Sequence, residues 1–145
     1  MMYGKYGYMT KVMCTGTFDI LHQGHLDYFR QAKQLGDYLV VVVARDSNAI
    51  KEGKQLQFEE KERLEHVASQ KIVDKAMLGN EGDKLKIVEQ EKPDVICLGY
   101  DQGDEEKLKE ALAKRGIFPR IVKAQAYHPE KYKSSLLKTI LQAQQ

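Results

Sequence analysis

The chain has 145 residues, a formal net charge of +2, 42% hydrophobic residues and only two cysteines. This length is enough for one domain with its own core and excludes the need for a disulfide scaffold. Acidic and basic residues are interleaved, and no segment approaches the roughly 20 apolar residues of a membrane span, so no nucleic-acid or membrane partner is expected.

The first ten residues contain no continuous apolar stretch, so we interpret them as a flexible N-terminal extension and not as a secretion signal. The remaining residues, 11–145, are predicted to form the single domain of a cytoplasmic protein. Cys14 and Cys97 both fall in apolar segments and are expected to be buried, reduced thiols.

A strand is predicted over residues 11–15, followed by Gly16, and a helix over residues 24–35, followed by Gly36. The strand is short and rich in β-formers. In the helix, apolar residues recur every three positions and a glycine ends the pattern. The ten residues between Gly16 and His25 therefore lie where a strand gives way to a helix.

Strands and helices alternate along the rest of the chain. The apolar run 38–44 is continuous, which is typical of a parallel strand covered on both faces. A polar stretch over residues 45–57 is predicted to be a loop. The later predicted elements are helix 58–69, strand 75–78, helix 83–91, strand 95–98, helix 105–115, strand 120–123 and helix 134–142. This order predicts an α/β, Rossmann-like fold: a five-stranded parallel sheet sandwiched by helices, with a crevice where the first and fourth strands end side by side.

The segment Gly-Thr-Phe-Asp-Ile-Leu-His-Gln-Gly-His, residues 16–25, is the strongest candidate for chemistry. Its backbone N–H groups and the positive end of the following helix can face a phosphate, and Gly24 lets that phosphate approach. His22 and His25 can donate hydrogen bonds to oxygens that gain charge in the transition state. Nucleotidyl transfer needs no protein nucleophile, because the acceptor brings its own phosphate. The alternatives are a helix-capping pair, a zinc site that would need two further ligands, or a catalytic role for nearby Cys14.

Two later segments fit the same crevice. Asp101 follows the strand 95–98 and can accept hydrogen bonds from a ribose or an amino group, or else cap the helix that begins near Asp104. Ser134 and Ser135 open the last helix after Lys133, where hydroxyls, free N–H groups and a lysine can hold pyrophosphate; ordinary N-capping is the alternative.

The polar stretch 45–57 contains Lys51 and Lys54, which suit either a mobile basic loop that closes over phosphates or a solvated connection. Arg63 could bind the acceptor phosphate or form a surface salt bridge. Asp19 could bind a divalent cation or the acceptor, or hold the turn. We expect Mg²⁺ or Mn²⁺ to arrive with ATP, with no tightly bound metal in the resting protein.

The segment 16–25 matches the Gly-Thr-Phe-Asp-x-x-His-x-Gly-His signature of the cytidylyltransferase-like nucleotidyltransferases. The chain most closely resembles the archaeal FAD synthetase group, through residues 42–46, residues 98–102, and Tyr127 followed by Ser134 and Ser135. The resemblance implies a homodimer with catalytic His22 and His25. It also implies that Thr17, Phe18, His22, Gln23, Gly24, His25, Asp101 and Tyr127 contact ATP. Together with Gly16, Ser134 and Ser135, which the turn and the last helix suggest, these residues make up the expected nucleotide-binding set.

The expected reaction is transfer of AMP from ATP to FMN, giving FAD and pyrophosphate. Bacterial glycerol-3-phosphate cytidylyltransferases share the first motif, but Lys133-Ser134-Ser135 stands where they carry Arg-Thr-x-Gly-Ile-Ser-Thr-Thr. A CTP-dependent cytidylyltransferase acting on glycerol 3-phosphate or a similar phosphoalcohol is therefore the alternative. A non-catalytic nucleotide sensor is a third hypothesis, and the intact histidine pair argues against it.

Overall fold

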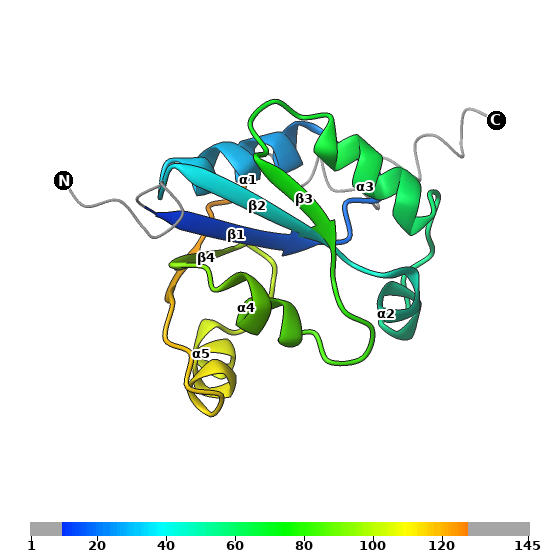
Figure 1. Ribbon diagram of the computed structural model, residues 1–145. Helices are drawn as coiled ribbons and strands as arrows, with labels where there is room; N and C mark the ends of the chain where they lie inside the picture. Colours follow the sequence, from blue (N-terminus) through cyan, green and yellow to red (C-terminus); the bar gives the residue numbers. More distant parts are fainter. Residues whose placement is uncertain (1–9, 128–145) are drawn as a thin grey trace.

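A five-stranded parallel sheet forms the centre of the structure, a computed structural model that describes residues 10–127 (Figure 1). The strands are β1 (Lys11–Gly16), β2 (Tyr38–Val43), β3 (Lys75–Leu78), β4 (Val95–Leu98) and β5 (Arg120–Lys123). Their order is β3-β2-β1-β4-β5, and β1 pairs in parallel with both β2 and β4. The predicted fold class and the predicted contact between the first and fourth strands are confirmed.

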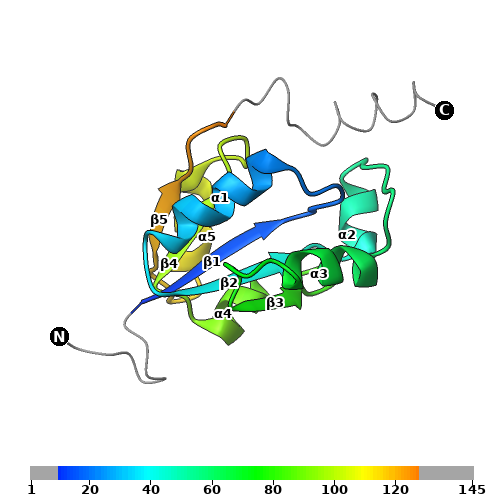
Figure 2. The ribbon, with the colours of Figure 1, turned by 90° about the horizontal axis from the view of Figure 1, so that it is seen from above.

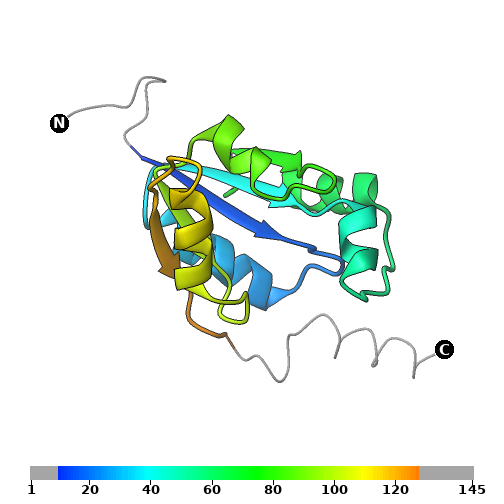
Figure 3. The same ribbon diagram turned by 90° about the horizontal axis from the view of Figure 1, so that it is seen from below.

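Helices cover both faces of this sheet. They are α1 (Gln23–Lys33), α2 (Asp46–Lys51), α3 (Glu60–Ala68), α4 (Lys86–Glu91) and α5 (Glu105–Ala113). Figure 2 shows α1 and α3 on one face, and Figure 3 shows α4 and α5 on the other. The short helix α2 lies beyond the carboxyl ends of the strands, at the edge where the histidine motif is found.

The predicted loop over residues 45–57 is wrong for residues 46–51, which form α2. Tertiary contacts hold this six-residue helix, because Ala49 is buried and the buried Asn48 side chain donates to the carbonyl oxygen of Asn80 at 2.8 Å. A helix this short has little stability of its own, and its few apolar residues give a weak periodic signal.

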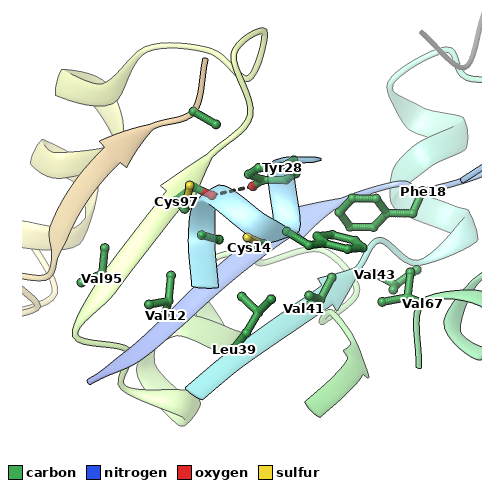
Figure 4. Packing of buried hydrophobic residues seen from close by; sticks show 13 residues of the cluster. Val12, Cys14, Phe18, Tyr28, Leu39, Val41, Val43, Val67, Val95 and Cys97 are labelled. Atoms are coloured by element: carbon green, nitrogen blue, oxygen red, sulfur yellow. Dashed lines mark hydrogen bonds between the residues drawn. The ribbon is translucent and has the colours of Figure 1, made fainter. Parts of the chain in front are cut away.

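The core has two halves, one on each face of the sheet. Val12 and Cys14 of β1 belong to the cluster under α1 and α3, whereas Met13 between them belongs to the cluster under α4 and α5. Figure 4 shows the first cluster. Both faces of the central strands are therefore apolar, which explains the continuous hydrophobic run of β2.

Aspartate carboxylates accept backbone hydrogen bonds at the amino ends of the strands. Asp37, Asp74 and Asp94 each accept a backbone N–H from a neighbouring segment, at 2.7–2.8 Å. These bonds satisfy backbone donors at the edge of the sheet opposite to the histidine motif.

No helix within residues 10–127 is long and apolar enough to cross a bilayer. Residues 1–9 of the predicted extension and the predicted helix 134–142 lie outside the described part of the chain.

Candidate nucleotide-binding site

The turn after β1 is shaped by Gly16 and Phe18. Phe18 has φ +54°, a left-handed conformation that a bulky residue rarely adopts and that costs about 1–3 kcal/mol. A Cβ on Gly16 would lie 2.7 Å from the Phe18 ring, so only glycine leaves room for this turn. The chain thereby folds sharply back over its own strand end, where it leads directly into the histidines.

His22 is the N-cap of α1. Its backbone is extended and its Nδ1 accepts the N–H of Gly24 at 3.0 Å. Because Nδ1 is the acceptor, the proton of the neutral ring lies on Nε2. The capping alternative from the sequence is therefore correct in structure, and it also sets the tautomer in which Nε2 can donate to a phosphate.

His22 and His25 form a stacked pair, with ring centroids 3.9 Å apart and an interplanar angle of 27°. The Phe18 ring meets His25 edge-on at 5.4 Å and packs against Phe29 at 5.2 Å. The buried Phe18 thus joins the histidine pair to the hydrophobic core, which fixes the orientation of the imidazoles.

Burial keeps both imidazoles neutral. Burial and, to a smaller extent, the neighbouring His22 lower the pKa of His25 to about 3, against the opposite effect of a hydrogen bond with the backbone of Ile20. Burial also lowers the pKa of His22. At neutral pH the pair is therefore a set of neutral hydrogen-bond donors beside the N-terminal end of α1.

Asp19 holds the turn and is not placed as a phosphate or metal ligand. It is 3% exposed, and its carboxylate accepts the backbone N–H groups of Gln57 and Phe58 at 2.8 and 2.9 Å. Among the three expectations for Asp19, binding a cation, binding the acceptor and holding the turn, these bonds support the last. The bonds fasten the segment before α3 against the motif.

Both expectations for Arg63, binding of the acceptor phosphate and a surface salt bridge, are wrong. It is neither a surface residue nor available to an acceptor phosphate, since its side chain is fully buried. Its guanidinium donates to the carbonyl oxygens of Phe58 and Thr17, at 3.1 and 2.8 Å, and to the Asp46 carboxylate at 2.7 Å. Arg63 therefore ties α2, α3 and the turn after β1 together.

Lys54 reaches the motif, whereas no such contact is seen for Lys51. The ammonium of Lys54 donates to the Thr17 hydroxyl at 2.7 Å, from an exposed segment with no regular secondary structure. Lys51 is the last residue of α2 and is exposed. The structure thus brings one of the two lysines to the edge where a phosphate would bind.

Asp101 lies where the crevice was predicted. It is exposed in the turn that follows β4. The helix α5 is capped by Asp104, whose carboxylate accepts the N–H groups of Glu106 and Lys107, so the capping role proposed as an alternative for Asp101 is wrong. Tyr127 is partly buried, and Lys133, Ser134 and Ser135 lie outside the described residues.

Two residues of this edge, Gln102 and Tyr28, were missed by the sequence analysis. The Gln102 amide bonds both to the end of β1 and to the start of its own turn, at Thr15 and Gly99. The buried Tyr28 hydroxyl donates to the carbonyl oxygen of Cys97 (Figure 4). No local sequence signal marks their bonds to Thr15 and Cys97, because these bonds join segments that are 87 and 69 residues apart along the chain.

The cysteines lie in the core, as predicted. Cys14 and Cys97 are register partners on β1 and β4, and both are buried. Burial raises the pKa of the Cys14 thiol well above its usual range, which argues against the alternative of a catalytic thiolate. Within residues 10–127, no three histidine, cysteine, aspartate or glutamate side chains are grouped so that they could hold a metal ion.

Comparison with known proteins places this geometry in a family. A model of the cytidylyltransferase-like family matches residues 13–140. FAD synthase from Thermoplasma volcanium is 50% identical over 128 residues, covering 88% of this chain and 90% of that protein. FAD synthase from Ferroglobus placidus is 52% identical over 119 residues, covering 81% of this chain and 78% of that protein.

Two solved structures have folds similar to that of this chain. A crystal structure from Thermoplasma volcanium, described as a lipopolysaccharide core biosynthesis protein, matches with a TM-score of 0.81 and 51% identity, over 83% of this chain and 99% of that one. Pantoate-β-alanine ligase from Francisella tularensis matches with a TM-score of 0.59 at 17% identity, over 90% of this chain and 65% of that one, and shares the fold alone.

Proposed function

We propose that this chain, which belongs to the cytidylyltransferase-like family, is an FAD synthase that transfers AMP from ATP to FMN and releases pyrophosphate. The observation that carries the proposal is the neutral His22–His25 pair at the N-terminal end of α1. The choice of FMN as the acceptor rests on the relatives named FAD synthase, each of which is about half identical to this chain.

In this reaction a phosphate oxygen of FMN attacks the α-phosphorus of ATP. The new P–O bond forms as the bond between the α-phosphorus and the bridging oxygen of pyrophosphate breaks. His22 and His25 donate hydrogen bonds to phosphate oxygens as negative charge grows on these oxygens. The N–H groups at the start of α1 add further positive potential there. In the free protein the pKa values of both imidazoles are lowered, so we assign them the role of neutral donors and not of proton carriers.

The nucleotide lies along the carboxyl edge of the sheet in this proposal. Gly16, Thr17 and Phe18 line the phosphate turn, Gln23 and Gly24 open α1, and Asp101 accepts hydrogen bonds from the nucleoside. Tyr127, Ser134 and Ser135 complete the proposed site, with Lys54 and Lys133 near the phosphates. The exposed position of Asp101 and the Lys54–Thr17 contact support this arrangement.

A panel of donors and acceptors tests the reaction. Purified protein is incubated with ATP or CTP against FMN, glycerol 3-phosphate or phosphoethanolamine, and both pyrophosphate and FAD are measured. We expect turnover with ATP and FMN. Turnover with CTP and glycerol 3-phosphate alone would establish the cytidylyltransferase alternative, and nucleotide binding without any turnover would establish a sensor.

We also propose that the protein is a cytoplasmic homodimer in which residues 11–145 form one nucleotidyltransferase domain. The proposed substrates, ATP and FMN, support this location. Sedimentation at several protein concentrations tests the dimer: a species of 16.6 kDa at every concentration would contradict it.

A further inference from the structure

The Gln102 side chain links β1 to the turn after β4, beyond the point where the backbone pairing of the two strands ends. β1 and β4 are in register from Val12 with Val95 to Cys14 with Cys97, and their pairing stops there. Beyond this point the Gln102 amide nitrogen donates to the carbonyl oxygen of Thr15 at 2.7 Å, and its amide oxygen accepts the N–H of Gly99 at 2.7 Å. The amide therefore bridges β1 and the turn after β4 at the point where their backbone pairing has ended.

The same residue closes the turn that carries Asp101. The backbone N–H of Gln102 donates to the carbonyl oxygen of Gly99 at 3.0 Å, so Gly99 is held through both its N–H and its C=O. A Cβ on Gly99 would lie 3.3 Å from the Gln102 side chain, which shows how closely the two pack. Asp101 stands at the exposed corner of this turn.

Tyr28 supports the amide from α1. Its buried hydroxyl donates to the carbonyl oxygen of Cys97, and it lies 3.3 Å from the amide oxygen of Gln102. Three elements, β1, β4 and α1, therefore meet at this one side chain. At neutral pH a carboxamide of this length offers a donor and an acceptor together, whereas an ionised carboxylate offers acceptors only.

We propose that Gln102 is a positioning residue for the nucleotide: by bridging Thr15 and Gly99 it holds the Gly99–Gln102 turn so that Asp101 faces the bound ATP. This inference rests on the proposed function. It assigns to Gln102 a role in ATP binding that acts through Asp101, with no contact between Gln102 and the reacting atoms.

The hydrogen bond that Gln102 donates to Thr15 can be tested with a side chain whose charge depends on pH. Gln102→Glu keeps the shape, but its ionised carboxylate loses the donor to Thr15, whereas its protonated form regains one donor and one acceptor. We expect the ATP Kd and KM of Gln102→Glu to be about tenfold or more above wild type near pH 8, with kcat changed much less. Near pH 4.5, where a glutamate with the ordinary pKa of about 4.3 is close to half protonated, both should move part of the way toward wild type.

Several variants serve as comparisons. Gln102→Met should remain weakened at both pH values, and Gln90→Glu, an exposed change on α4, should match wild type. The ionisable groups around the turn include Tyr28 on α1, Cys14 on β1, Cys97 on β4, Tyr100, Asp101 and Asp104 after β4, and Lys123 on β5, which donates to the carbonyl oxygen of Gly103. Dividing the ATP Kd and KM of each variant by the wild-type values at the same pH removes the contribution of these groups.

A double-mutant cycle tests the action through Asp101. Asp101→Asn removes the carboxylate and leaves the bridge, so adding Gln102→Met to Asp101→Asn should weaken ATP binding by less than Gln102→Met does alone. Full additivity would overturn the proposal. So would variants at position 102 that lower the Tm but leave the ATP Kd unchanged, since these would show a purely structural role.

Calorimetric measurement of the ATP Kd separates this inference from the proposed reaction. If the wild type binds ATP but forms no FAD, the proposed reaction fails while the binding pattern of the Gln102 variants still decides the positioning role.

Discussion

His22 and His25 stack within 3.9 Å of each other, and the first of them caps the helix on which the second lies. Two imidazoles this close cannot both carry a positive charge without strong repulsion. The contact adds to burial, which is the main cause of the lowered pKa of His25, and so helps to keep this imidazole neutral at the end of α1.

Replacing either histidine by alanine should lower kcat by about 10²–10³-fold, the effect of losing one transition-state donor. The ATP Kd should change less, because the charge that these donors stabilise develops during transfer. Steady-state kinetics and calorimetry measure both quantities. His66→Gln, in α3, is the control for a histidine outside the motif. Near-normal kcat for His25→Ala would refute the catalytic assignment.

Acid should destabilise the fold through His25. Its pKa is about 3 in the folded protein against 6.5 as the ordinary value, so the unfolded state binds the extra proton between these values. The free energy of unfolding should therefore fall as pH drops below 6.5, by up to about 1.4 kcal/mol per pH unit from this group. Urea titrations of wild type and His25→Gln measure the slope. An identical pH dependence in both proteins would contradict the assignment.

Removing the buried guanidinium of Arg63 should lower the free energy of unfolding by about 2–4 kcal/mol. Arg63→Met leaves the carbonyl oxygens of Thr17 and Phe58 without this donor and separates Asp46 from its ion-pair partner. The control is Arg30→Met, which removes an exposed pair with Asp27 at 3.9 Å and should cost less than about 1 kcal/mol. Equal stability of the two variants would show that the Arg63 contacts contribute nothing.

The segment between α2 and α3 is predicted to close over the phosphates of ATP. Trypsin should cut the free protein after Lys51 and Lys54, which are exposed, and ATP should slow this cleavage. Adenosine, which lacks the phosphates, is the matched control and should protect little. If ATP and adenosine leave the cleavage rate the same, the segment is only a solvated connection.

Chelation should stop turnover without unfolding the protein. A divalent cation that arrives with ATP bridges its phosphates and needs few protein ligands, so EDTA should abolish FAD formation while leaving the Tm unchanged. Mg²⁺ or Mn²⁺ should restore the rate. Zinc found in stoichiometric amount, and lost only as the protein unfolds, would contradict this prediction.

The sheet, its strand order and the location of the histidines could be predicted because their signals are local. Apolar runs, helical spacing and the glycines that end them are all read within a few residues. The roles of Arg63 and Gln102 could not be predicted in this way. Their bonds to Thr17 and Thr15 span 46 and 87 residues, and only the folded sheet brings these partners together.

Those long spans have a consequence for the protein as it is made. A ribosome that has released β1, α1 and β2 has already exposed the complete histidine segment, but neither Arg63 nor Gln102 has yet emerged. Contacts this distant along the chain close late in folding. We therefore expect the nascent chain to ignore ATP until its fourth strand and the following turn are made, so that an unfinished copy sequesters no nucleotide.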